Sequence, residues 1–122
     1  MRPWLSRLRH DLVKRAVWPA RDLRDLGREP SAADLAHLRR GFFELRDGDG
    51  APVTSGALWK RFREEAPAGP AAPLDAFGAA LAEAEVAVRA LESHPGSWRE
   101  ALDALLRIET AFAALARSLE EE

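Results

Sequence analysis

A chain of 122 residues has the length of one domain, with a hydrophobic core that needs no metal or disulfide. Hydrophobic residues make up 47% of the sequence and charged residues 31%, which is typical of a globular protein and excludes a disordered one. The sequence contains no cysteine, which excludes disulfides, thiol catalysis and cysteine-bound zinc and favours a cytoplasmic location. No apolar run approaches the roughly 20 residues that span a bilayer, so we do not expect stable membrane insertion.

The net charge of −2 is divided unevenly along the chain. Residues 1–40 contain ten Lys and Arg against five Asp and Glu, whereas residues 41–122 contain eight against fifteen. The simplest interpretation is that the two parts attract each other within the fold. A basic N-terminal part is also suited to contact an anion, a membrane surface or an acidic partner.

The composition predicts an all-α fold. Ala, Leu, Arg and Glu dominate, Ile occurs once and Tyr is absent, so the residues that favour strands are scarce. No segment alternates polar and apolar residues with the period of two that a half-buried strand shows. We therefore predict a single compact bundle of four to five helices, with residues 1–122 forming one domain.

The first helix is predicted over residues 4–18. At 100° per residue, one side of it collects an apolar stripe made of Trp4, Leu5, Leu8, Leu12 and Ala16. Proline has no N–H to donate to the preceding turn, so Pro19 predicts a break or a kink at this point.

A short helical piece follows, with Leu23 and Leu26 turned inward, and Gly27 ends it. The next helix begins after Ser31, which is the predicted N-cap. Asp34, three residues later, completes a variant of the capping box. The buried face of this helix is predicted to consist of Leu35, Leu38, Phe42 and Leu45.

Residues 66–73, APAGPAAP, separate the front of the chain from the back. Three prolines and a glycine are not expected to sustain a helix. In front of them, residues 1–65 carry the shorter helices, the last of which holds Leu58, Trp59 and Phe62.

Behind this connection, residues 74–122 are predicted to form a long antiparallel helical hairpin. Its first helix covers about residues 74–92, and the turn HPGS joins it to the second helix. Ser97 and Glu100 match a Ser-x-x-Glu capping box at the start of that second helix.

The run DGDG has the residues of a cation-binding loop but does not complete one. If Gly50 takes the sixth position of an EF-hand loop, Asp47 and Asp49 take the third and fifth. Leu45 and Gly56 then fall at the first and twelfth positions, so the closing carboxylate is missing. We therefore predict a connecting loop and no metal site. The chain also lacks a phosphate loop and a nucleophile elbow, so we predict no catalytic residue, no cofactor and no enzymatic activity.

His37 offers an alternative role. It is predicted to point away from the buried face of its helix, with Arg40 three residues later and Gly41 four residues later. This spacing is similar to the motif of the histidine phosphotransfer domains of bacterial signalling, in which a nearby cation stabilises a phosphoryl group. Arg39 and Phe42 depart from the residues that the family places at those positions. The resemblance implies a phosphate-accepting role for His37 in a helical signalling domain.

The first helix also has a basic side, formed by Arg7, His10 and Lys14, opposite its apolar stripe. An amphipathic helix of this kind can attach to an anionic or membrane surface, which is a third alternative. The simpler interpretation is that the stripe completes the bundle. No aromatic platform is interleaved with the cations and the pI is about 5.9, so nucleic-acid binding is not predicted.

We expect a non-enzymatic protein–protein interaction or regulatory module, as in many small all-α bacterial domains without a pocket motif. Its partner would be another protein or a second copy of the chain. Val13, Val17, Trp18 and Phe43 do not fit the buried stripes and are available for an exposed patch. Aromatic residues and arginines dominate interface hot spots. The predicted partner-binding residues are Trp18, His37, Arg39, Arg40 and Phe43.

Overall fold

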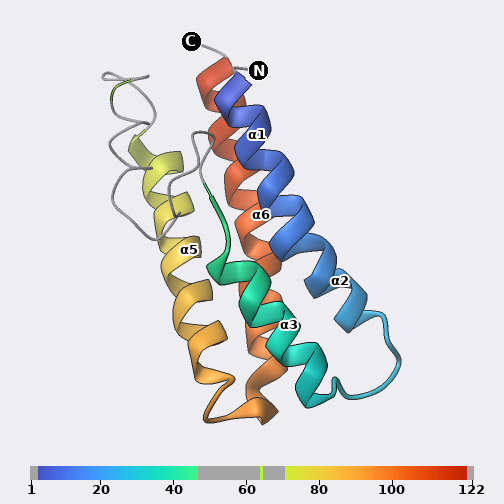
Figure 1. The fold of residues 1–122 in the computed structure, drawn as a ribbon. Coiled ribbons are helices and arrows are strands. Elements are labelled where there is room, and N and C mark those ends of the chain that lie inside the picture. Colours follow the sequence, from blue (N-terminus) through green and yellow to red (C-terminus); the bar gives the residue numbers. More distant parts are fainter. Residues whose placement is uncertain (1–2, 47–63, 65–70, 121–122) are drawn as a thin grey trace.

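The computed structural model describes residues 3–46, 64 and 71–120, and the elements in these ranges are all helical (Figure 1). In chain order they are α1 (Pro3–Leu12), the π-helical turn η1 (Val13–Val17), α2 (Trp18–Arg24), α3 (Ala32–Phe43), α5 (Ala71–Ala90), the 3₁₀ turn η2 (Pro95–Ser97) and α6 (Trp98–Glu120). The predicted all-α class is confirmed. The DGDG run, the short helix expected before residue 66 and the first residues of the 66–73 connection lie outside the described residues.

The bundle is organised around α6. The chain descends through α5, turns, and returns through α6 beside it, and α5 and α6 form the most extensive helix–helix contact (Figure 1). The continuous run of α1, η1 and α2 also packs on α6, and α3 contacts η1, α2 and α5. The largest fully buried side chains come mainly from α1, α3, α5 and α6 and include Leu5, Leu8, Leu12, Leu38, Phe77, Leu105, Ile108 and Leu115.

The chain does not break at Pro19. The backbone stays helical from α1 to the end of α2, and the turn before the proline widens to a π-turn. Its signature is the hydrogen bond from the N–H of Trp18 to the carbonyl of Val13, five residues back. The wider turn accommodates a proline that would otherwise collide with the preceding turn of an α-helix. Of the predicted break or kink, the break is therefore wrong, because a local π-turn keeps the helix continuous.

The π-turn also changes which residues are buried. It adds one residue to the turn, so Val17 joins Ala16 in the buried apolar stripe. Val17 is fully buried and therefore cannot line an exposed patch. Trp18, the next residue, turns outward and leaves 55% of its surface exposed. Leu26, predicted to point inward, lies beyond the end of α2 and is 37% exposed.

A close crossing joins α3 to η1 at Gly41. A Cβ atom built on Gly41 would lie 2.6 Å from the carbonyl oxygen of Arg15, so only glycine allows the two backbones to approach this closely. Arg15 is the residue four before Pro19, and proline has no N–H to donate to its carbonyl. α3, the helix that carries His37, therefore packs on η1 at the carbonyl of Arg15, which receives no hydrogen bond from Pro19.

The start of α3 is capped as predicted. The hydroxyl of Ser31 accepts a hydrogen bond from the N–H of Asp34 at 3.2 Å, and the carboxylate of Asp34 accepts one from the N–H of Ser31 at 2.9 Å. Arg28 adds a third contact to the same carboxylate at 3.3 Å. These interactions, first the backbone hydrogen bond from Ser31, lower the pKa of Asp34 below its ordinary value.

The two long helices begin differently from the prediction. α5 starts at Ala71, since Pro73 lies in the first turn of the helix, where a missing N–H costs no hydrogen bond. The capping box expected from Ser97 and Glu100 is absent from the described hydrogen bonds. Residues 95–97 form the 3₁₀ turn η2, and the hydroxyl of Ser97 donates back to the carbonyl of His94 at 2.8 Å.

The substitution Gly41→Ala is expected to destabilise the fold. Alanine favours a helix interior over glycine by about 1 kcal/mol, whereas overpacking costs about 1–3 kcal/mol. Urea unfolding should therefore show a net loss on the order of 1 kcal/mol. Gly96→Ala is the matched control, because a Cβ at Gly96 meets no atom within 4 Å. A Gly41→Ala protein as stable as the parent would contradict the close crossing.

The lowered pKa of Asp34 predicts a pH-dependent contribution to stability. A carboxylate with a lower pKa in the folded state stabilises the fold above its unfolded pKa, and this is lost as the pH falls through the folded value. The parent should be more stable than Asp34→Asn at neutral pH, and the difference should shrink as the pH falls below 3.8. Unfolding curves across this range measure it, with Asp103→Asn as the control for loss of one exposed carboxylate. A difference independent of pH would contradict the assignment.

Candidate functional site

The five residues predicted to bind a partner do not form one site. Trp18 lies at the junction of η1 and α2. Arg39, Arg40 and Phe43 line a groove between α3 and α5. His37 is exposed on α3 and lines neither of these surfaces.

Trp18 forms one wall of a hollow of 260 Å³ on the outer side of α1 and η1. The residues that line it, which we call the Trp18 surface, are Ser6, Arg9, His10, Val13, Lys14 and Trp18. Steps of three or four residues, such as Ser6 to Arg9 and Lys14 to Trp18, place them along one face of the continuous helix. The surface thus combines a large exposed indole with cationic side chains.

A second hollow of 270 Å³ adjoins the Trp18 surface, because Arg9 and Val13 line both. It lies between the N-terminal helix and α6, with mainly apolar residues on its walls. These are Leu12, Val13, Val17, Phe112, Ala113 and Ala116, together with Arg9, Glu109 and Arg117. The two hollows adjoin at Arg9 and Val13, and we call them together the trough. Its lining includes Leu12 and Phe112, which belong to the hydrophobic core.

The cations along this trough have no anionic partner within the described residues. No ion pair or side-chain hydrogen bond connects Arg9, Lys14 or Arg117 with another described residue. The carboxylate of the trough, Glu109, is already bound by Arg21, with both oxygens 3.1 Å from the same guanidinium nitrogen. The available charge of the trough is therefore positive.

The groove between α3 and α5 has a different composition. Arg89 stacks on the ring of Phe43, with the guanidinium carbon 4.7 Å from the ring centroid, and is also held by Glu85. Phe43 is half-buried against the core and so already contributes to packing. Arg39 lies 3.8 Å from the carboxylate of Glu92, which is too long for a hydrogen bond.

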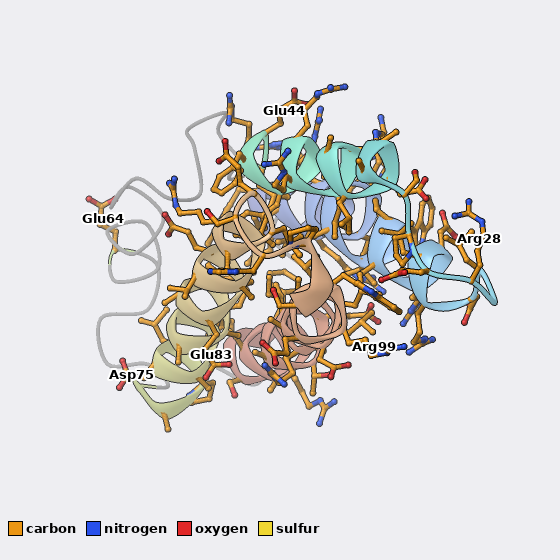
Figure 2. All side chains as sticks on the ribbon, turned by 90° about the horizontal axis from the view of Figure 1, so that it is seen from below. Arg28, Glu44, Glu64, Asp75, Glu83 and Arg99 are labelled. Carbon is orange, nitrogen blue, oxygen red and sulfur yellow. The ribbon has the colours of Figure 1, made fainter. Side chains whose placement is uncertain are left out.

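A cluster of charges fastens the end of α3 to η1. Asp11 accepts hydrogen bonds from the side chain of Arg15 and from the backbone N–H of Arg46, both at 2.8 Å. Arg15 also donates a hydrogen bond at 2.9 Å to the carboxylate of Glu44, which lies at the end of α3 and is labelled in Figure 2. These contacts, first the hydrogen bond that Arg15 donates to Asp11, raise the pKa of Arg15 above its ordinary value. The cluster holds α3 in place.

The phosphotransfer role of His37 stays a prediction. His37 is exposed, and its side chain makes no hydrogen bond with another described residue. Gly41, four residues after His37, lies at the crossing with Arg15. Among the described residues, no group of three or more His, Cys, Asp and Glu side chains could hold a metal ion.

Sequence reasoning missed several residues of both grooves. Arg89 reaches the α3–α5 groove from α5 and Glu92 from the turn after it, some 50 residues away, and Phe112 and Arg117 reach the trough from α6. No local pattern marks these positions, because their proximity depends on how the helices pack. The helical spacing of Arg9, Val13 and Lys14 is the signal in the sequence that points to one side of the trough.

Comparison with known proteins gives no assignment: no family model, curated protein or solved structure matches this chain. In the described ranges, none of the helices has both the length and the apolar character needed to traverse a bilayer.

Proposed function

We propose that this chain is a non-enzymatic protein–protein interaction module, and that it binds an acidic segment of a partner protein along the trough. The observation that supports this most directly is the exposure of Trp18 beside an apolar hollow and unpaired cations. Tryptophan and arginine are the residues most enriched at the centres of protein interfaces.

The apolar part of the trough supplies binding energy. Trp18 exposes more than half of its surface, and burying an aromatic side chain of this size on a partner is strongly favourable. The adjoining hollow offers a place for an apolar side chain of the partner, on walls that include Val13 and Phe112. Both features fit a segment that inserts one or two apolar residues.

The charges of the trough select the partner. Arg9 and Lys14 lie beside Trp18, and Arg117 lies on the opposite wall from Arg9. Complementary charge accelerates encounter and excludes partners of the wrong sign. An acidic segment therefore fits, whereas a basic one is repelled.

Attachment of the apolar stripe of the first helix to a membrane is not supported. Trp4, Leu5, Leu8 and Leu12 are buried in the core, so the stripe completes the bundle and is not available to lipid. The exposed cations of the trough remain able to attract an anionic surface, which makes vesicle binding an outcome to be tested. Phosphotransfer through His37 has no supporting contact in the structure.

The test measures partner binding by variants of the trough. Proteins captured from native extract are identified, and the affinity of each purified candidate is measured for the parent and for Trp18→Ala. Loss of a hot-spot tryptophan typically costs about 2 kcal/mol or more, so affinity should fall roughly 30-fold or more. Val86→Ala is the control, because Val86 is also well exposed but lies on α5.

The charged residues are tested separately. The double substitution Arg9→Gln and Lys14→Gln should weaken binding and reduce its dependence on salt. Arg99→Gln with Arg107→Gln removes the same net charge from α6, away from the trough, and should have little effect. Partners that bind all of these variants equally would exclude the trough. Salt-sensitive binding to anionic vesicles with no protein partner would favour the membrane alternative, and concentration-dependent dimerisation lost in Trp18→Ala would identify a second copy as the partner.

A further inference from the structure

The guanidinium of Arg39 has unused hydrogen-bonding capacity. Its Nε atom is buried and has no hydrogen-bond partner within the described structure, although the side chain as a whole is 30% exposed. Its described ion pair, to Glu92, is 3.8 Å long. Buried donors in native proteins are normally satisfied by the protein, by water or by a bound ligand. Arg39 is half-buried, has five N–H donors and makes no hydrogen bond with a described residue, so we expect a ligand to supply an acceptor.

Two further cations lie along the same groove. Arg40 directly follows Arg39 on α3, lines the same groove and makes no ion pair with a described residue. Arg89 reaches the groove from α5 and is fixed by Glu85 and by the ring of Phe43. Other arginines of the fold, such as Arg15, hold a carboxylate by a short hydrogen bond. The three arginines of this groove are thus contributed by two helices and are only partly neutralised.

The carboxylate already present does not satisfy the groove. Glu92 is 81% exposed and lies beyond hydrogen-bonding distance of Arg39, so little holds it there. Glu85 accepts two hydrogen bonds from the guanidinium of Arg89, both at Oε1. A ligand that binds here needs more acceptor atoms and more negative charge than a single carboxylate offers.

We propose that the α3–α5 groove, lined by Ala36, Arg39, Arg40, Phe43, Arg89 and Glu92, binds a phosphoryl group. A phosphate monoester carries a charge of about −1.5 to −2 at neutral pH and three acceptor oxygens, so it can bind Arg39 and Arg40 together. The groove is open to solvent and has a volume of about 430 Å³, which leaves room for the group that carries the phosphate. Binding displaces Glu92 from Arg39.

This site is separate from the trough. The two share no lining residue, so the phosphoryl site does not depend on the proposed protein-binding function. The phosphate could belong to a phosphorylated small molecule or to a phosphorylated side chain, since both present the same oxygens. The experiment distinguishes these two sources.

The first measurement follows the arginine Nε–Hε signals of ¹⁵N-labelled protein by NMR during titration with sodium phosphate. Chloride maintains constant ionic strength, and Arg39→Lys assigns the Arg39 signal. We expect a saturable shift of the Arg39 and Arg40 signals with phosphate and a much weaker response to acetate. The signal of Arg107, which is paired with Glu83 in another groove, should not shift.

Variants give an independent readout of the same site. Arg39→Gln should weaken phosphate binding at least tenfold, whereas Arg107→Gln should leave it unchanged. Glu92→Gln should strengthen binding several-fold, because it removes the competing carboxylate. Glu83→Gln is the charge-matched control, since Glu83 carries the same charge on α5 but faces Arg107.

The affinities of two further ligands, a phosphoserine peptide and free O-phosphoserine, identify the source of the phosphate. A peptide containing phosphoserine that binds at least tenfold more tightly than free O-phosphoserine, with no binding of the unphosphorylated peptide, identifies a modified protein. Equal affinities identify a small molecule. Absence of a saturable shift, an equal response of all arginines, or an equal response to acetate would overturn the proposal.

Discussion

A proline inside the N-terminal helix is the constraint on which the arrangement of this bundle depends. Pro19 has no N–H and would collide with the turn before it, yet the helix continues because η1 takes one residue more than an α-turn. The carbonyl of Arg15 cannot receive a hydrogen bond from the proline nitrogen. α3 crosses the helix at this carbonyl, where Gly41 supplies the space for a close approach. The π-turn η1 is therefore also the place where α3 packs against the N-terminal helix.

The same turn shapes the candidate binding surface. By inserting one residue it places Val17 in the core and sends Trp18 outward, beside the cations of the preceding turns. π-turns inside α-helices are often found at functional sites, where they re-aim a side chain. The adjacent ion cluster of Asp11, Arg15 and Glu44 then fixes α3 against the turn. Fold and surface therefore have a common origin in the sequence around Pro19.

Local rules predicted the parts of the structure that depend on local chemistry. The stripe from Leu5 to Leu12 and the Ser31 cap follow from periodicity and from backbone preferences. The predicted end of the short helix at Gly27 is wrong by three residues, because α2 ends at Arg24, and the positive φ of 71° at Gly27 belongs to the turn that follows. The π-turn was not predicted, because a proline within a helix can be accommodated by a break, a kink or a wider turn. The grooves were not predicted either, since they join residues on helices that are distant in the sequence.

The distribution of paired and unpaired charges supports a functional interpretation of the trough. Exposed ion pairs contribute little to stability, so pairing Arg9 or Lys14 with a neighbouring carboxylate would bring the fold only a small gain. Leaving them unpaired, however, produces a local positive field that persists within about 10 Å at moderate salt. In the proposed complex, such a field would accelerate the encounter with an acidic partner, whereas burial of Trp18 would lengthen the lifetime of the complex. Charge and aromatic surface on one face of the same helix would then act on different steps of binding.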